Sequence, residues 1–346
     1  MISKEFSNKI YWARFICAIM VVGLHCNNVD ILKIPVDSWS ANIQNFFRNY
    51  IYSVAVPFFF IVSGFFFYST LNKENFEYKW KKHIKKTIYL YLFWNIIYTL
   101  YRMIKTNASV LSSFGRSHQM ESITFQNIVD GIFLHKYNDV WWFMLQLVIL
   151  ELIAPIIWKI IAKTKNCKII LAVIFVGAIV QSIFITREYP IRLYSFFYYF
   201  IGVYIAIEKK QILCEKQSLK YLLFHIVFGE MFIAIFHICG VKQLEWIPLT
   251  CLTLGVWQLF YNVFDFGECK EKLKISFFMF AAHPFFVGIV YEIEKRMFSV
   301  TNAMSIMCFL INPLIITLLL MIAVFILKKI KLYPILTGDI LIERKM

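Results

Sequence analysis

Two ionisable side chains, Arg14 and His25, lie inside the first apolar segment of the chain, RFICAIMVVGLH. In a helix, eleven residues at about 100° each return to within roughly 20° of the starting face, about 16 Å further along the axis. Both side chains are therefore expected on one face of one helix. A guanidinium can organise anionic groups, and an imidazole can accept a proton near neutral pH.

A structural role remains open for each of these residues. A guanidinium near the cytoplasmic end of a span can extend to the headgroups, which would explain Arg14 without any chemistry. A histidine such as His25, near the external end, is often a hydrogen-bonded packing residue. The first segment alone does not decide between these roles and catalysis.

The composition favours a membrane protein, because 60% of the 346 residues are hydrophobic and 18% are aromatic. Soluble domains are usually about half apolar. A hydrocarbon layer of about 30 Å needs close to twenty apolar residues in a helix, and ten segments meet this length approximately. These segments are 10–26, 50–71, 84–104, 140–161, 168–186, 191–207, 219–238, 246–264, 275–293 and 305–327. The sequence predicts an all-α polytopic membrane protein with about ten transmembrane helices, in which residues 1–346 form a single membrane domain.

The basic residues between these segments predict the orientation, since cytoplasmic loops retain Lys and Arg. Most of the 36 Lys and Arg residues collect on one side of the predicted membrane. They lie in residues 4–9, 73–86, 159–168, 209–220, 270–274 and 328–345. Both termini are therefore expected in the cytoplasm of a bacterial cell, with the protein multi-pass in the plasma membrane. The net charge of +15 then reflects topology and attraction to the lipid bilayer, and it requires no nucleic-acid partner.

The first segment lacks a small-residue cleavage site, so we expect it to remain as the first span. The eight cysteines are scattered, without a paired CxxC spacing. They are interpreted as small core residues, and no metal site is predicted.

The second expected span, SVAVPFFFIVSGFFFY, carries a further pattern at Phe59, Phe60, Ser63, Gly64 and Phe65. An Arg separated from a His by ten residues in span one, followed by Phe-Phe, two residues and Ser-Gly-Phe in span two, resembles the acyltransferase-3 family of integral-membrane acyltransferases. The resemblance covers nearly the whole chain. It includes the ten spans, the basic loop after the second, and an aromatic start to the fourth at residues 141–143. Echoes at residues 200–202 and at His283 with Pro284 are equally compatible with ordinary helix packing.

This resemblance implies an acyl-CoA donor, usually acetyl-CoA, on the cytoplasmic side, with no permanently bound cofactor. It implies an acceptor hydroxyl on a cell-surface or exported carbohydrate. The basic run KWKKHIKK fits the donor, because its ammonium groups can neutralise the phosphates of coenzyme A. The candidate donor-binding residues are Lys81, Lys82, Lys85 and Lys86, together with Ser63 in the second span. Where the family often has two arginines separated by two residues, this chain has Lys82 and Lys85, which keep the charge and lose the bidentate geometry. A basic loop lying on anionic lipid is the alternative for any single lysine.

The mechanism that we predict uses His25 as the general base, which takes the proton of the acceptor hydroxyl as it attacks the thioester carbonyl. Arg14 would organise the path of the donor, whose long pantetheine arm can extend along one helix face. Ser63 and Gly64 would let helices approach closely and line the channel, although small residues are also common at span interfaces without any chemistry.

Three further residues are weaker candidates for substrate contact or proton transfer. Asp30 follows His25 in HCNNVD. This spacing resembles the motif of glycerolipid acyltransferases, in which four residues separate a His from an Asp, but that family has a different fold. Asp30 could also orient His25. Glu151 lies at the centre of span four, where a carboxylate should be protonated, paired or facing a wet cavity. Trp142, with Tyr137, Asn138, Asp139 and Trp141, ends the long external loop of residues 102–139 and could contact a sugar or anchor the interface.

A second class of function stays open at this point. A multi-span transporter or flippase for a glycan precursor or small solute would also carry buried Arg14, Glu151 and several histidines. Acyl transfer would depend on the donor and on His25, whereas transport would give substrate flux without coenzyme A. The sequence does not determine the acceptor, the length of the acyl chain or the oligomeric state.

Overall fold

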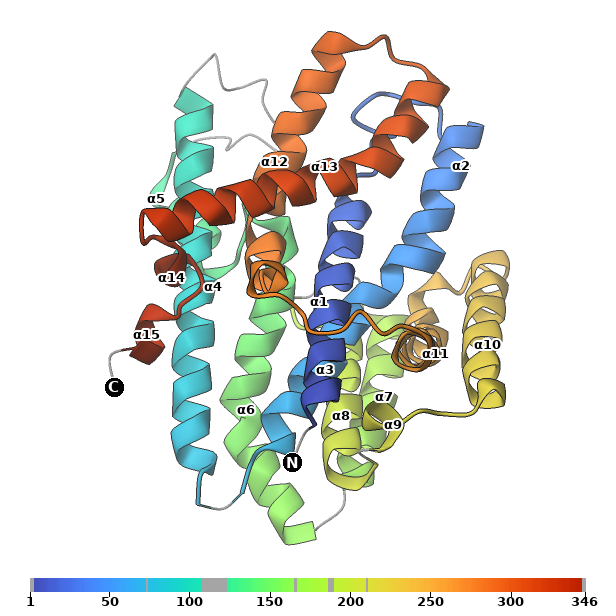
Figure 1. The fold of residues 1–346 in the computed structure, drawn as a ribbon, viewed down its shortest axis with the longest axis vertical. Helices are drawn as coiled ribbons and strands as arrows, with labels where there is room; N and C mark the ends of the chain where they lie inside the picture. The colour runs from blue at the N-terminus through green and yellow to red at the C-terminus, as the bar shows by residue number, and fades with distance from the viewer. Residues whose placement is uncertain are drawn as a thin grey trace. The chain divides into compact units, whose positions relative to one another are not determined.

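The computed structural model describes residues 3–72, 74–107, 123–164, 167–185, 190–209 and 211–343, and all regular structure in this part of the chain is helical (Figure 1). Each of the ten expected apolar segments contains a helix. They are α1 (Lys4–His25), α3 (Ala55–Ser69), α4 (Phe76–Asn107), α6 (Trp142–Thr164), α7 (Lys168–Phe184), α8 (Leu193–Glu208), α10 (Leu219–Ile238), α11 (Trp246–Val263), α12 (Ser276–Met297) and α13 (Asn302–Lys329).

Five helical stretches among the described residues are long and apolar enough to cross a membrane: Trp39–Ser69, Asp139–Lys163, Leu219–Ile238, Ser276–Met297 and Asn302–Lys329. Two shorter apolar helices, α7 and α8, accompany them. The prediction of an all-helical protein with apolar spans is therefore confirmed. The count of about ten spans and the cytoplasmic termini stay predictions.

Contacts between Cα atoms divide the chain into two units, each assembled from three separate stretches. The first unit comprises Met1–Val21, Asn49–Lys79 and Ile153–Lys274, and the second comprises Val22–Arg48, Trp80–Leu152 and Ile275–Met346. Helices α1, α4 and α6 each contribute to both units, so neither unit is a continuous segment of sequence.

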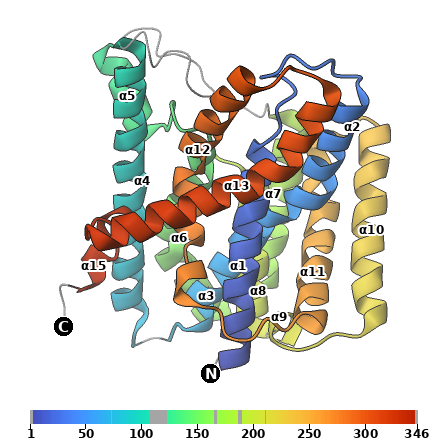
Figure 2. The ribbon, with the colours of Figure 1, turned by 45° about the horizontal axis from the view of Figure 1, so that its top comes forward.

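The first unit is built on a close packing of α3 against α8. A Cβ atom added at Gly202 would overlap the carbonyl oxygen of Ile61, and one added at Gly64 would overlap that of Tyr199. The glycines therefore let the two backbones touch, as small residues do between membrane helices. Helix α7 packs on α8, and α10 lies beside α11 (Figures 1 and 2). The short α9 (Gln211–Cys214) and the 3-10 helix η4 (Lys242–Leu244) connect these helices.

The second unit contains α12 and α13, which pack together, and α2 (Trp39–Phe46), which packs on α13. Helix α13 contains Pro313 and runs across α12 in both views (Figures 1 and 2). The unit also holds most of α4, with α5 (Phe125–Phe133), α14 (Tyr333–Leu336) and α15 (Ile340–Glu343).

Two expected loops contain helices. The stretch between the first two spans forms α2, followed by a π-helical turn at Phe47–Ile51 and a 3-10 turn at Tyr52–Val54 that lead into α3. The expected loop of residues 102–139 begins within α4 and contains α5. Its centre, residues 108–122, lies outside the described residues. These helices were missed because polar residues lower the average hydropathy without preventing helix formation.

Candidate active site

Helix α1 contains both Arg14 and His25, as their spacing predicted, and it ends at His25. The His25 side chain is half-buried. Its ring centroid lies 5.0 Å from that of His283, with the ring planes inclined at 45°. Both histidines belong to the second unit. The structure thus brings the predicted base next to a second imidazole from α12, near the other end of the sequence.

The orientation of His283 is fixed by the backbone of α12. The residue is fully buried, and its Nδ1 lies 2.8 Å from the carbonyl oxygen of Phe280 and 3.1 Å from that of Met279. A carbonyl oxygen only accepts, so Nδ1 must carry the proton. Pro284, the next residue, has no N–H to donate to Phe280, and the His283 ring occupies the acceptor that proline leaves open. The His-Pro pair therefore sets the imidazole in one tautomer.

The chain that follows His25 is held by a buried polar cluster, formed by Asn28, Gln44 and Ser305. All three side chains have no exposed surface. Gln44 accepts from the backbone N–H of Asn28 at 3.0 Å, and its amide donates to Asn28 Oδ1 at 2.9 Å and to Ser305 Oγ at 2.8 Å. Ser305 Oγ donates to Asn28 Oδ1 at 2.7 Å, and Asn28 Nδ2 donates to the Ser305 carbonyl at 2.9 Å.

This cluster joins the end of α1 to α2 and α13. The hydroxyl of Tyr291, on α12, also donates to the carbonyl of Cys26. The segment immediately after His25 is therefore bonded to three other helices of the same unit, to α2 and α12 through its backbone and to α13 through the Asn28 side chain. Directional bonds of this kind fix the position of a side chain more tightly than apolar contact does.

Aromatic rings pack around the α12 segment that carries His283. Trp141 is fully buried, stacks on Phe280 at 5.2 Å between centroids, and donates from Nε1 to the carbonyl of Tyr91 at 3.1 Å. Trp142, the predicted sugar contact, is half-buried at the first residue of α6. Tyr137 and Asn138 are buried, so the residues just before α6 belong largely to the packed interior.

Glu151 is buried in α6, as expected for a carboxylate in the middle of a span. Its carboxyl group is hydrogen-bonded to the side chain of Thr87 on α4, and its backbone carbonyl accepts from the indole of Trp80 at 2.8 Å. The structure thus gives Glu151 neutral polar neighbours within the second unit. Arg14 belongs to the first unit, so the alternative of an Arg14–Glu151 pair stays a prediction.

The four predicted donor-binding lysines all lie in the first turns of α4. Lys81, Lys82 and Lys85 are exposed. Lys86 is half-buried, and its Nζ lies 2.8 Å from Asp339 Oδ1, near the end of the described chain. Lys86 therefore has a carboxylate partner, and the other three lysines are exposed on the same helix.

The remaining predicted residues are distributed differently. Arg14 is half-buried on α1 and Ser63 is half-buried on α3, both in the first unit. Asp30 is exposed beyond the end of α1, and its backbone carbonyl accepts from the N–H of Lys33 at 3.3 Å. The structure therefore does not place the Asp30 carboxylate on the His25 ring.

Sequence reasoning gave too little weight to His283 and did not identify Asn28, Gln44 or Ser305. The His-Pro pair inside an apolar helix was the available signal for His283. The three polar residues gave only the weak signal of uncharged side chains beside apolar segments. None of the eight cysteines, all within the described residues, forms a disulfide, and the described part of the chain contains no cluster of His, Cys, Asp and Glu suited to a metal ion.

Comparison with known proteins decides the family. The family model described as an acyltransferase domain, that of the acyltransferase-3 family, matches residues 8–328. The chain belongs to the acyltransferase-3 family. The resemblance found at Arg14, His25 and residues 59–65 is thereby confirmed, and membership extends across both units and nearly the whole sequence.

A curated relative of this acyltransferase-3 protein is an amino-acid racemase from Enterococcus faecalis. The two are 23% identical over 325 residues, which are 84% of this chain and 42% of the relative. The chain thus spans less than half the length of that relative. No solved structure matches the chain.

Proposed function

We propose that this acyltransferase-3 protein transfers an acetyl group from cytoplasmic acetyl-CoA to a hydroxyl of a cell-surface or exported carbohydrate. The observation that carries the proposal is the pair formed by His25 and His283, with ring centroids 5.0 Å apart. One imidazole ends α1, and the other is fixed by the backbone of α12. Family membership supports the acyl transfer, and the histidine pair supplies a group that can move the proton.

In the proposed reaction His25 accepts the proton of the acceptor hydroxyl as its oxygen attacks the thioester carbonyl. A bond forms between this oxygen and the acyl carbon, and the carbon–sulfur bond of the thioester then breaks. The proton on His25 passes to the departing thiolate, so the products are the O-acetyl ester and coenzyme A. His25 is neutral again at the end of the cycle.

His283 is a positioning residue in this proposal. Because its Nδ1 donates to Phe280, its other nitrogen, Nε2, is left as the acceptor. An imidazole held in this tautomer beside His25 favours particular orientations of the His25 ring. The buried polar cluster at Asn28 fixes the backbone next to the same ring.

The proposal places the donor on the cytoplasmic side, and the basic start of α4 supports this. Lys81, Lys82 and Lys85 are exposed there and can neutralise the phosphates of coenzyme A. Arg14, two turns or more along α1 from either end, would organise the acyl-pantetheine arm. Ser63, Trp142 and Glu151 are weaker candidates for contact with the donor, the acceptor or a proton path.

The test is acetyl transfer in membranes that carry equal amounts of each protein, with labelled acetyl-CoA as donor and surface glycans analysed for O-acetyl groups. Removal of a general base typically lowers the rate by about 10²–10⁴-fold, and we expect this for His25→Ala. His283→Gln should give a smaller loss and a changed pH profile of kcat/KM. His225→Ala is the matched control, because His225 is a helical histidine whose Nδ1 also bonds a carbonyl, that of Tyr221, in the first unit.

Equal activity in the wild type and His25→Ala would remove His25 as the base. Solute flux that needs no coenzyme A, with no acetylated product, would favour the transporter alternative. A pH profile of His283→Gln that matches the wild type would reduce His283 to a packing residue.

A further inference from the structure

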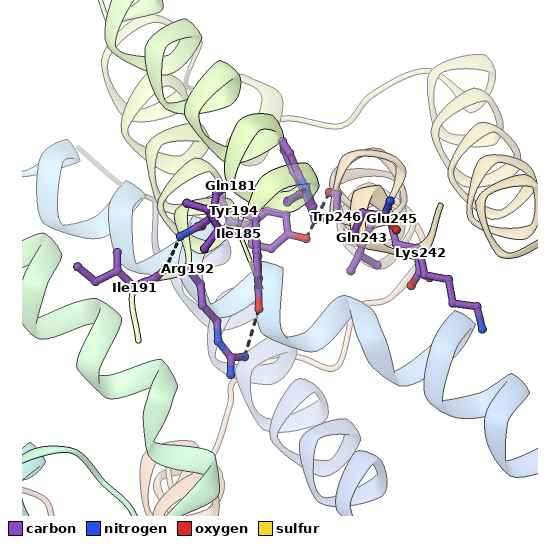
Figure 3. A pocket seen from close by; sticks show the side chains of 12 residues that line it. Gln181, Ile185, Ile191, Arg192, Tyr194, Lys242, Gln243, Glu245 and Trp246 are labelled. Atoms are coloured by element: carbon purple, nitrogen blue, oxygen red, sulfur yellow. Dashed lines mark hydrogen bonds between the residues drawn. The ribbon is translucent and has the colours of Figure 1, made fainter. Parts of the chain in front are cut away.

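A cavity of about 310 Å³ lies within the first unit, where the end of α7 meets the start of α8 and where η4 leads into α11 (Figure 3). Small-molecule sites usually occupy roughly 300–1,000 Å³, so this volume is at the lower end of that range. The cavity belongs to one unit throughout, and none of the residues singled out for acyl transfer lines it. It can accommodate a small ligand or one end of a larger one.

Hydrogen bonds hold the wall of this cavity in shape. Gln181 Nε2 donates to the carbonyl of Ile191 at 2.7 Å, and its Oε1 accepts from the N–H of Leu193 at 2.6 Å. On the adjoining side, Trp246 Nε1 donates to Ser182 Oγ at 3.1 Å. These bonds tie α7 to α8 and to α11. The cavity is therefore preformed and does not depend on a ligand to order its wall.

The charges that line the cavity favour an anion. Arg192, at the start of α8, and Lys242, on η4, both line the cavity, and the Lys242 side chain extends away from the other labelled side chains (Figure 3). Arg192 Nη1 donates to the hydroxyl of Tyr194 at 3.2 Å, which holds the guanidinium beside an aromatic ring. The lining carboxylate, Glu245, lies 3.0 Å from Nε2 of His237, a residue outside the lining. Among the described residues that line the cavity, two carry positive charge and one carries a carboxylate.

The backbone adds to this preference, because α8 and α11 both begin at the cavity. Their N-cap residues are Arg192 and Glu245, and neither side chain caps its helix by a hydrogen bond. The first N–H groups of a helix carry partial positive charge and favour anions. This contribution is independent of the two cationic side chains.

The cavity at the other end of α11 differs in charge. It has a volume of about 260 Å³ and is lined by Lys4 and Lys9 together with Glu5, Asp265 and Glu268. Lys4 lies 3.8 Å from Glu268, and Lys9 lies 3.2 Å from Glu5. Among the described lining residues, carboxylates outnumber cations here, whereas cations outnumber carboxylates in the α7–α8–α11 cavity.

We propose that the α7–α8–α11 cavity binds an acidic sugar residue of the carbohydrate acceptor, a hydroxylated ring that bears a carboxylate or a phosphate. The role as an acceptor subsite rests on the proposed function. Arg192 binds the anionic group, since a planar guanidinium matches both carboxylate and phosphate oxygens. The half-buried ring of Tyr194 contacts the sugar face, and Lys242 adds charge at the rim. The basic-residue pattern predicts that this end of the unit faces outward, where an exported carbohydrate is found.

Binding is measured by isothermal titration of the purified full-length protein in phosphatidylcholine nanodiscs. The probes are methyl glucuronoside, glucose 6-phosphate and the neutral methyl glucoside. We expect one or both acidic sugars to bind and methyl glucoside to bind at least about tenfold more weakly, since a hydrogen bond to a charged group contributes about 1.5–3 kcal/mol. The preferred acid identifies a uronate or a sugar phosphate as the natural group.

The variants Arg192→Gln and Lys242→Gln test the two cations. Arg192→Gln should lower the affinity for the acidic probe about tenfold. Arg192→Lys should lower it less, because lysine keeps the charge but lacks the planar guanidinium. Lys242→Gln should weaken it about twofold. Lys220→Gln, at the opposite end of α10, is the matched control and should bind as the wild type. Equal binding of acidic and neutral sugars, or unchanged binding in Arg192→Gln, would overturn the proposal.

The lipid composition of the nanodisc distinguishes a sugar-binding site from a lipid-headgroup site. Loss of sugar binding when phosphatidylglycerol is included would identify a lipid-headgroup site and overturn the proposal. The titration uses no acyl donor, and His25→Ala should bind the acidic probe normally. Binding of the acidic sugar without acetyl transfer would therefore contradict only the proposed function. Acetyl transfer by a protein that does not bind acidic sugars would contradict only the acidic acceptor subsite.

Discussion

Two helix contacts of this acyltransferase-3 protein, one in each unit, are made by different means. In the first unit, α3 and α8 meet at Gly64 and Gly202, where backbone touches backbone. In the second unit, the cluster of Asn28, Gln44 and Ser305 joins α1, α2 and α13 through buried hydrogen bonds. Small residues and interhelical hydrogen bonds are the two general solutions to helix association in a membrane, where lipid is as apolar as a leucine side chain.

The difference concerns what each contact can fix. A glycine contact brings two helices close, and its strength comes from dispersion over the apposed surface. A hydrogen-bonded cluster fixes the direction of each polar group as well as the distance. The buried polar cluster begins three residues after His25, where the proposed chemistry needs a defined orientation. The glycine contact lies in the unit whose proposed role is to bind part of the acceptor.

The largest effect is expected from Gly202→Ala. The added Cβ would overlap the carbonyl oxygen of Ile61 and lie 2.8 Å from the backbone nitrogen of Phe65. Both neighbours are backbone atoms and cannot rotate away, so α3 and α8 must separate. Overpacking of this kind costs about 3 kcal/mol or more. We expect a large loss of monodisperse protein in size-exclusion chromatography and a much lower Tm for the remainder.

Gly177→Ala provides the control for this prediction. Gly177 lies on α7, and a Cβ there would meet only the Cδ1 atom of Leu193 at 3.4 Å, an ordinary contact. Alanine also favours a helix over glycine by up to about 1 kcal/mol. The Tm should therefore stay the same or rise. Equal behaviour of Gly202→Ala and Gly177→Ala would show that backbone contact does not hold the first unit together.

The next effect is expected from Gln44→Leu in the second unit. Leucine has a similar size but leaves the buried N–H of Asn28 without an acceptor, while Ser305 keeps its bond to Asn28 Oδ1. Each buried unsatisfied group costs about 1–3 kcal/mol. Because the cluster holds the chain after His25, we expect kcat to fall further than the lower Tm alone would explain. Acetyl transfer is therefore measured below the Tm of the variant.

Gln211→Leu is the corresponding control, since Gln211 is exposed at the start of α9. Its kcat and Tm should match the wild type. A lower Tm in Gln44→Leu with unchanged kcat would separate the buried polar cluster from the placement of His25. The buried hydrogen bonds would then have no role in orienting His25 that the glycine contact lacks.

The helices of the fold could be predicted from sequence because hydropathy is a local property. Each expected apolar segment contains a helix, and Arg14 and His25 lie on one helix as their spacing required. The close approach expected at Gly64 is also present. The division into two interleaved units could not be predicted, because it depends on which helices pack together and not on how apolar each one is.

The surroundings of His25 could be predicted only in part. Arg14 and His25 belong to a motif in one segment, and a motif is visible without a fold. His283 is 258 positions away from His25, and Ser305 is 277 positions from Asn28. Uncharged residues such as Asn, Gln and Ser occur in many helices, so only the packing distinguishes the three that meet. Lys86 shows the reverse case, because its charge suggested a donor contact and the structure pairs it with Asp339.

The smallest effect is expected from the Lys86–Asp339 pair, a polar contact of the second unit that is not buried. The two side chains are 32% and 44% exposed, and exposed ion pairs contribute about 0.2–1 kcal/mol. Asp339→Asn should therefore change the Tm slightly, far less than Gln44→Leu. Under the proposed function, Lys82→Ala and Lys85→Ala should each raise the KM for acetyl-CoA about two- to fivefold. Lys86→Ala should raise it less, because Asp339 already neutralises its charge. A Tm loss in Asp339→Asn as large as that in Gln44→Leu would mean that polar contacts stabilise the second unit whether or not they are buried. Burial of the hydrogen bonds would then not explain how the polar cluster differs from the glycine contact of the first unit.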